Sequence, residues 1–150
     1  MKTLFEYAGG ELALRRFVEA FYSKVLADPL LRPLFGQGKP GHVDHLTAFT
    51  AECFGGPDNF SREMGGFSGL IDAHRGLKIR EDQRRRFIQL YMEAADESGL
   101  PADARFRQAL REHVEFGSVV AKQNSHAAND AELHPLREVP IWTWPDEKAG

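Results

Sequence analysis

The chain has 150 residues, a single cysteine and a formal net charge of −3 at pH 7. This length suits one domain that buries about two-thirds of its unfolded surface and can enclose a cofactor, while the slightly acidic charge gives no electrostatic basis for binding nucleic acid or anionic membranes. The lone Cys53 excludes an intramolecular disulfide, and because there is neither a leader nor an apolar run of membrane-spanning length we expect a soluble, cytoplasmic protein.

Apolar residues recur every three to four positions in four segments, which predicts four amphipathic helices. In the first of them Leu14, Phe17, Phe21 and Val25 form the stripe. No segment alternates as a strand would, so the fold is predicted to be all-α. A short turn around Gly99 joins the last two helices, which we therefore expect to be antiparallel neighbours. The predicted helices cover residues 11–27, 41–54, 81–97 and 101–122.

Tyr22 lies at the edge of the first helix's apolar face, where a buried hydroxyl must find a hydrogen-bond partner. Residues 30–35 follow as a short apolar turn interrupted by Pro33, and residues 36–41 as a loop. A core tyrosine with its hydroxyl bonded is the common case in such a position. Tyr22 alone therefore does not indicate a ligand site.

His42 opens the second helix on the side of its apolar stripe, which is formed by Leu46, Phe49 and Cys53. An imidazole in that position is either satisfied by a local hydrogen bond or directed at a ligand, and the spacing leaves both open. His45 is rotated away from the stripe. It is expected at the rim of the face, where it can meet solvent or an anionic group.

The segment of residues 58–72 is rich in glycine and has little periodicity, which predicts a loop or a short irregular helix. We therefore expect this loop, and not a rigid helix of several turns, to position His74. A histidine followed by an Arg-Gly turn and then by Lys78 is typical of a ligand to a metal or a haem iron. A surface histidine in a loop has the same local pattern, so both interpretations stay open.

The composition changes after about residue 125. The last part of the chain holds three prolines, few aliphatic residues and the cluster Ile141-Trp-Thr-Trp144. This predicts an extended tail over residues 126–150 whose two tryptophans dock on the globular body or on a partner subunit.

Together these features resemble the truncated haemoglobins, the short two-over-two globins, and most of all their second group. The resemblance covers roughly residues 4–124 and depends on the ordered spacing of several motifs. It implies a globin-like two-over-two helical sandwich, with a truncated globin domain over residues 1–125 and the tail as a C-terminal extension. The matching features are Gly9-Gly10 before the first long helix, Phe21-Tyr22 within it, Phe35 before the second helix, Gly55-Gly56-Pro57 after that helix, and His74 followed by Leu77, Lys78 and Ile79.

What the resemblance implies for the site is a haem b cofactor with His74 as the proximal ligand to its iron. Phe35 would pack on the porphyrin, and Tyr22 and His42 would lie on the opposite, distal side, within reach of a bound diatomic gas. The remaining positions would form the apolar wall and the charged edge of the pocket. The wall would comprise Leu46, Phe49 and Phe87, with Leu77 and Ile79 beside the ligand, and Lys78 and His45 would pair with the haem propionates.

The implied function is the binding of dioxygen or another small ligand, such as NO, CO or peroxide, by a monomer or homodimer. Two hydrogen-bond donors opposite one iron can also assist peroxide cleavage, so an NO dioxygenase or peroxidase-like activity with an external electron donor is open. Phe87 departs from the second group, which usually has a tryptophan there. Because phenylalanine cannot donate a hydrogen bond, we expect weaker retention of dioxygen than in a tryptophan-bearing relative.

Three alternatives remain at this point. His42 could itself reach the iron, giving a six-coordinate haem instead of an open one. A non-haem metal could bind His42, His45 and His74, although no carboxylate completes such a set. The third alternative is a cofactor-free, all-α interaction module that uses the tryptophans of the tail to bind a partner.

Overall fold

The computed structural model describes residues 2–36, 38 and 41–145, and within them the secondary structure is entirely helical. The prediction of an all-α fold is confirmed. Gln37, Lys39 and Pro40 of the predicted 36–41 loop lie outside the described residues. The helices are α1 (Leu4–Ala8), α2 (Gly10–Ala27), α3 (Arg32–Phe35), α4 (His42–Cys53), α5 (Asn59–Glu63), α6 (Gly66–His74), α7 (Glu81–Glu97) and α8 (Ala104–His126), followed by a 3-10 turn at Asp130–Glu132.

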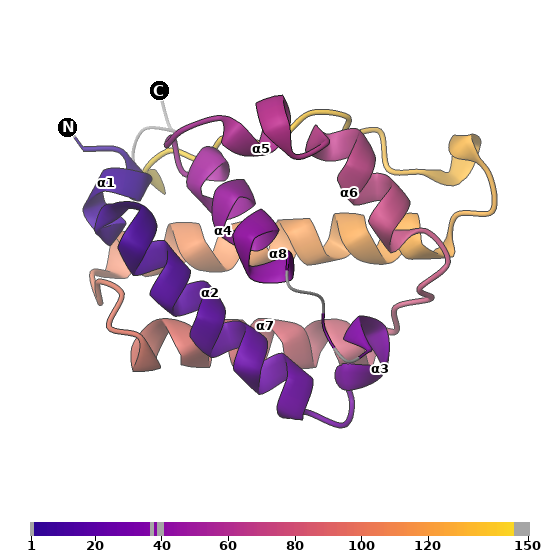
Figure 1. Ribbon diagram of the computed structural model, residues 1–150, viewed down its shortest axis with the longest axis horizontal. Coiled ribbons are helices and arrows are strands. Elements are labelled where there is room, and N and C mark those ends of the chain that lie inside the picture. Colours follow the sequence, from indigo (N-terminus) through magenta and orange to yellow (C-terminus); the bar gives the residue numbers. More distant parts are fainter. Residues whose placement is uncertain (1, 37, 39–40, 146–150) are drawn as a thin grey trace.

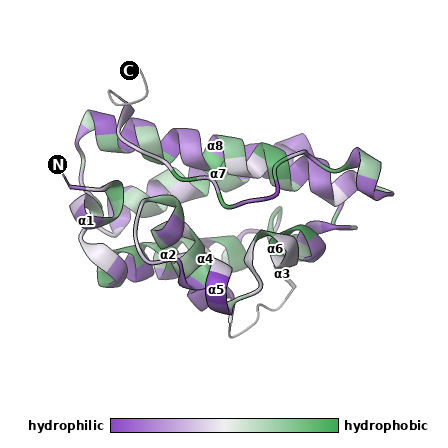
Figure 2. Ribbon diagram, turned by 90° about the horizontal axis from the view of Figure 1, so that it is seen from above, coloured by the Kyte–Doolittle hydropathy of each residue, from purple (hydrophilic) through white to green (hydrophobic). Residues whose placement is uncertain are grey.

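Four long helices form two layers, with α2 and α4 crossing in front of the antiparallel pair α7 and α8 (Figure 1). The apolar stripe of α2 is buried as its spacing predicts, because this helix packs on both α4 and α7. Hydrophobic residues lie between the layers and polar residues face outward (Figure 2). The predicted two-over-two sandwich is therefore present.

The segment before His74 differs from the prediction that a loop positions this histidine. His74 is the last residue of the nine-residue helix α6 and is not positioned by a loop. Three glycines lower the helix propensity of this segment, but Phe67 and Ile71 are buried against Val120 of α8. Tertiary burial therefore outweighs local preference, and His74 is held on a rigid element.

Other boundaries differ for local reasons. α1 forms because Thr3 and Glu6 make a reciprocal capping box. Residues 32–35 form a helical turn that tolerates Pro33, since proline in the first turn removes no intrahelical hydrogen bond. α8 starts at Ala104, where the Asp103 carboxylate accepts hydrogen bonds from the first backbone amides, and it continues one turn beyond the predicted end.

The tail docks on the body of the molecule, as one of the two predicted arrangements requires. It runs back beside α8 toward the N-terminus (Figures 1 and 2). Trp144 is only 4% exposed, and its indole Nε1 donates to the carbonyl of Lys2 at 2.8 Å. The backbone N–H of Trp142 donates to the carbonyl of Cys53 at 2.6 Å.

Candidate functional site

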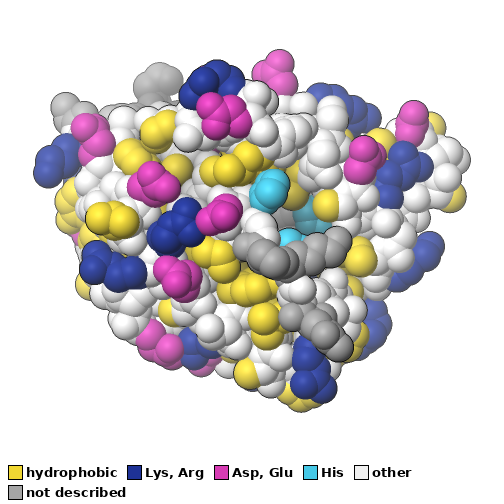
Figure 3. Space-filling model, viewed as in Figure 1, with side chains coloured by type: hydrophobic (Ala, Val, Ile, Leu, Met, Phe, Trp, Pro, Cys, Tyr) yellow, Lys and Arg dark blue, Asp and Glu magenta, His cyan; other side chains and the backbone are white. Residues whose placement is uncertain are grey.

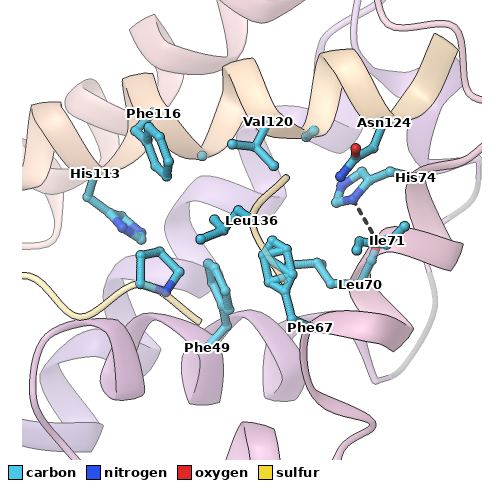
Figure 4. A pocket seen from close by; sticks show the side chains of 13 residues that line it. Phe49, Phe67, Leu70, Ile71, His74, His113, Phe116, Val120, Asn124 and Leu136 are labelled. Carbon is cyan, nitrogen blue, oxygen red and sulfur yellow. Dashed lines mark hydrogen bonds between the residues drawn. The ribbon is translucent and has the colours of Figure 1, made fainter. Parts of the chain in front are cut away.

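A small cavity of about 40 Å³ lies between α6, α8, α4 and the tail (Figure 4). Its wall is almost entirely apolar, as in small-molecule and cofactor pockets, but its volume is well below the range of such pockets. His74 is one of two histidines in the wall. The lining comprises Phe67, Leu70, Ile71 and His74 of α6, His113, Phe116, Gly117, Val120, Ala121 and Asn124 of α8, Phe49 of α4, and Leu136 and Pro140 of the tail.

His74 is held in one tautomer by its own helix. Its Nδ1–H donates to the carbonyl of Leu70, one turn earlier, at 2.9 Å. With the proton on Nδ1, the lone pair lies on Nε2, which is the nitrogen that can bind a metal. Burial lowers the pKa of His74 below its ordinary value, against the smaller opposing effect of the Leu70 hydrogen bond. Burial thus favours the neutral form of the imidazole, which is the form that binds a metal.

The segment after His74 is fixed by Ser125, near the end of α8. The carbonyl of Ser125 accepts from the backbone N–H groups of Gly76 and Lys78, at 3.2 and 3.3 Å, and its hydroxyl accepts from the N–H of Ile79 at 3.0 Å. Leu77 closes the turn by donating to the carbonyl of His74. Lys78 adopts a left-handed φ of 55° and has an exposed side chain. The sequence analysis missed Ser125 because its hydrogen-bond partners lie some fifty residues earlier in the sequence.

Tyr22, Phe35 and His42 form a second cluster, which joins α2, α3 and α4. The Tyr22 hydroxyl and His42 Nδ1 share a hydrogen bond of 2.5 Å. The Phe35 ring centroid lies 6.1 Å from that of Tyr22 and 6.3 Å from that of His42. Histidine side chains gather at a hollow in this face of the molecule (Figure 3). The structure therefore brings together the three residues that the resemblance puts near one another.

The four remaining predicted residues occupy different surroundings. Phe49, seven positions after His42 on α4, lines the His74 cavity, and Leu46 packs against the main core. Phe87 packs edge-on against Phe21, with 4.9 Å between ring centroids. His45 is exposed, and its Nδ1–H donates to the carbonyl of Gly41 at 2.7 Å. His42 and Phe49 share a helix face, so this face of α4 connects the two clusters.

Residues 3–121 match the bacterial-like globin family. The chain belongs to this family. Its matches include the group 1 truncated haemoglobin of Nostoc commune, with 30% identity over 82 residues that cover 54% of this chain and 65% of that protein. The group 2 truncated haemoglobin of Bacillus subtilis is 27% identical over 96 residues, covering 64% of this chain and 72% of the relative.

Solved globin structures superpose on most of the chain. The haemoglobin of Chloroflexus aurantiacus has a TM-score of 0.71 and 29% identity, covering 81% of this chain and 98% of that one. The group II truncated haemoglobin of Bacillus anthracis has a TM-score of 0.74 and 23% identity, covering 87% and 98%. The predicted truncated haemoglobin is confirmed, and both groups are among the matches.

Membership of the globin family implies a haem cofactor and the binding of a small gas such as dioxygen. The residues present fit such a group. His74 offers an unprotonated Nε2 beside an apolar cavity, while Lys78 supplies an exposed cation just beyond it. Among the described residues, no three or more His, Cys, Asp or Glu side chains lie close enough to hold a metal ion, so the alternative of a non-haem metal site has no support. The described helices also include none that could cross a membrane.

His113 is a buried imidazole of this globin that the sequence analysis missed. It is 5% exposed, and its Nδ1 has no hydrogen-bond partner among the described residues. The rings of Phe54, Tyr91 and Trp142 surround it at centroid distances of 5.2 to 6.4 Å. Burial lowers its pKa to about 4, so it stays neutral at physiological pH. Its neighbour Val114 on the apolar stripe is the one sequence signal that places it near the core.

The low pKa of His113 predicts that the apoprotein loses stability as the pH falls from about 6.5 to about 4. In this window the unfolded chain takes up a proton at His113 and the folded chain does not, so the unfolded state gains about 1.4 kcal/mol for each pH unit. We expect His113→Phe to flatten the pH dependence of the free energy of unfolding, measured by urea denaturation. An unchanged slope in His113→Phe would contradict this assignment.

Proposed function

We propose that this protein binds haem b through His74 and uses it to bind dioxygen or a similar diatomic gas. The observation that carries the proposal is the hydrogen bond from His74 Nδ1 to the carbonyl of Leu70, which leaves Nε2 to bind iron beside an apolar cavity. The bound haem would supply the reversible bond to the gas. The protein would supply the proximal ligand, a dry pocket and hydrogen-bond donors to the gas.

The Tyr22–His42 pair would provide the donors. A phenol hydroxyl and an imidazole N–H are both hydrogen-bond donors, and the structure holds these two side chains together through their shared hydrogen bond. A gas that carries partial negative charge would accept a hydrogen bond from this pair, and a hydrogen bond to a charged acceptor contributes about 1.5–3 kcal/mol.

We propose an open iron and no ligation by His42. Nδ1 of His42 shares a 2.5 Å hydrogen bond with the Tyr22 hydroxyl, and the first turn of α4 holds the ring against Tyr22 and Phe35. If the ring keeps these contacts, the ferrous, gas-free protein is five-coordinate, whereas ligation through Nε2 of His42 would make it six-coordinate.

The remaining predicted residues would complete the pocket. Phe35, Leu46, Phe49 and Phe87 would exclude water, which slows oxidation of ferrous iron, and Leu77 and Ile79 would flank the proximal ligand. The exposed side chains of Lys78 and His45 would pair with the anionic propionates of the haem. Such exposed pairs would direct the orientation of the haem more than its affinity.

Redox chemistry on NO or peroxide is a second use of the same site, with the Tyr22–His42 pair as the proton donor and an external protein as the electron donor. The alternative of a cofactor-free interaction module is not favoured, because Trp144 is buried against the protein's own N-terminal segment. Binding of CO, a monomeric or homodimeric state and a cytoplasmic location stay as predictions from the sequence.

Optical titration tests the proposal. Addition of haemin to the apoprotein should give a Soret band that saturates at one haem per chain. Reduction should then give the broad visible band of a five-coordinate ferrous haem, and CO should sharpen and shift the Soret band. Sharp, split visible bands before CO is added would contradict the open iron, and the absence of any saturable Soret band would contradict the haem site itself.

A further inference from the structure

The tail forms part of the cavity wall beside His74. Leu136 and Pro140 both line this cavity, and Leu136 points into it toward the residues of α6 and α8 (Figure 4). Phe116 of α8 is another lining residue. Its ring centroid lies 5.9 Å from that of His134 and 6.1 Å from that of Trp142. The cavity is therefore closed on one side by a segment that follows the last long helix of the fold.

This part of the tail is anchored at several points. The backbone N–H of His134 donates to the side-chain oxygen of Asn124, which is 1% exposed, at 3.0 Å. Further along, the N–H of Trp142 donates to Cys53, and the indole of Trp144 donates to Lys2. The ring of Trp144 also packs edge-on against Tyr7 at 5.0 Å. These anchors involve α8, α4 and the N-terminal segment, so the tail spans the molecule under constraint at both ends.

The tail also completes the packing of α6. Phe67 and Ile71 on the inner face of α6 share a small hydrophobic cluster with Val120, and Leu133, Leu136 and Val139 of the tail pack against that cluster. α6 has nine residues and low intrinsic helix propensity because of its glycines. Its position, and that of His74 at its end, therefore depends on this cluster.

We infer that residues 133–144 act as a strap that clamps α6 against α8 and, with Leu136 as the positioning residue, slows the loss of haem from His74. The inference rests on the proposed function, since it concerns the retention of haem at His74. Removing the Leu136 side chain would open the cavity wall next to α6, admit water and allow α6 to shift, and both effects favour dissociation of the iron–histidine bond.

Two leucines of the tail permit a matched test. Leu133 and Leu136 pack on the same cluster, but only Leu136 lines the cavity. The haem-loaded variants Leu136→Ala, Leu133→Ala and Leu136→Met are compared with the wild type for three properties: the rate of haem transfer to excess apomyoglobin, the iron–histidine stretching frequency, and the thermal midpoint. We expect Leu136→Ala to lose haem about tenfold faster and to shift the stretching frequency. Leu136→Met, which keeps the volume, and Leu133→Ala should stay within about twofold of the wild-type rate.

Equal acceleration by both alanine variants, in proportion to their thermal midpoints, would overturn the inference, because the tail would then contribute only general stability. Wild-type rates of haem transfer in both alanine variants would overturn the inference as well. The proposed function fails separately: if a His74→Gly variant keeps the wild-type stretching band, His74 is not the ligand, and the strap has no haem bond to protect. If that band is lost in His74→Gly and the leucine variants still behave like the wild type, only the strap is wrong.

Discussion

Replacing His74 with glycine is expected to lower the affinity of the protein for haem by at least about a hundredfold. Loss of a residue that only orients a metal ligand typically lowers metal affinity about 10- to 100-fold, and loss of the ligand itself should have a larger effect. The variant removes Nε2 but leaves the Leu70 carbonyl and the apolar lining of the cavity in place. Haem affinity would be measured from the Soret absorbance during titration with haemin.

Added imidazole supplies the internal control for this variant. The glycine leaves a space the size of the missing ring, so free imidazole should restore haem binding and the wild-type spectrum. His113→Phe is the matched control, since it removes the other imidazole of the same cavity and should retain haem. Weak binding in His113→Phe together with normal binding in His74→Gly would reverse the assignment of the ligand.

Replacing Tyr22 with phenylalanine is expected to speed dioxygen release about ten- to a hundredfold, which corresponds to the loss of one hydrogen bond to a charged acceptor. The substitution removes the hydroxyl that shares the 2.5 Å bond with His42 and keeps the ring that packs near Phe35. Phe87 cannot compensate, because it has no donor. The off-rate would be measured by mixing the oxygenated protein with excess CO in a stopped-flow instrument.

Further variants separate the pair from general packing. His42→Leu should also speed dioxygen release. In the double variant the off-rate should rise by less than the product of the two single increases, because the two side chains act through one shared hydrogen bond. Tyr91→Phe removes a hydroxyl next to Phe87, where the ring centroids are 6.4 Å apart, and should leave the off-rate unchanged. A wild-type off-rate in Tyr22→Phe would show that the pair does not contact the gas.

The parts of the fold that the sequence predicted depend on local periodicity. The stripes of α2, α4, α7 and α8 repeat over several turns, so their burial follows from spacing alone. The same spacing put His42 and Phe49 on one face of α4, and the structure brings His42 to Tyr22. The positions that share one face of a helix follow from the spacing within that helix, so they can be predicted without knowing its neighbours.

The errors come from contacts between distant segments. The segment of α6 was predicted as a loop or a short irregular helix, and its glycines were weighed without Val120, about fifty positions later, which buries its apolar face. Ser125 and His113 were missed for the same reason, since their roles depend on α6 and on the tail. Nothing in the tail's composition indicates that Leu136 and Pro140 line the cavity, because an extended segment has no periodicity that reveals which side is buried.

The most direct measurement of the central claim is the resonance Raman spectrum of the haem-loaded, ferrous, gas-free protein, compared between wild type and His74→Gly. We predict an iron–histidine stretching band in the wild type, its loss in the variant, and its return at a shifted frequency when imidazole is added. An iron–histidine band that persists at the wild-type frequency in His74→Gly without imidazole would contradict ligation by His74.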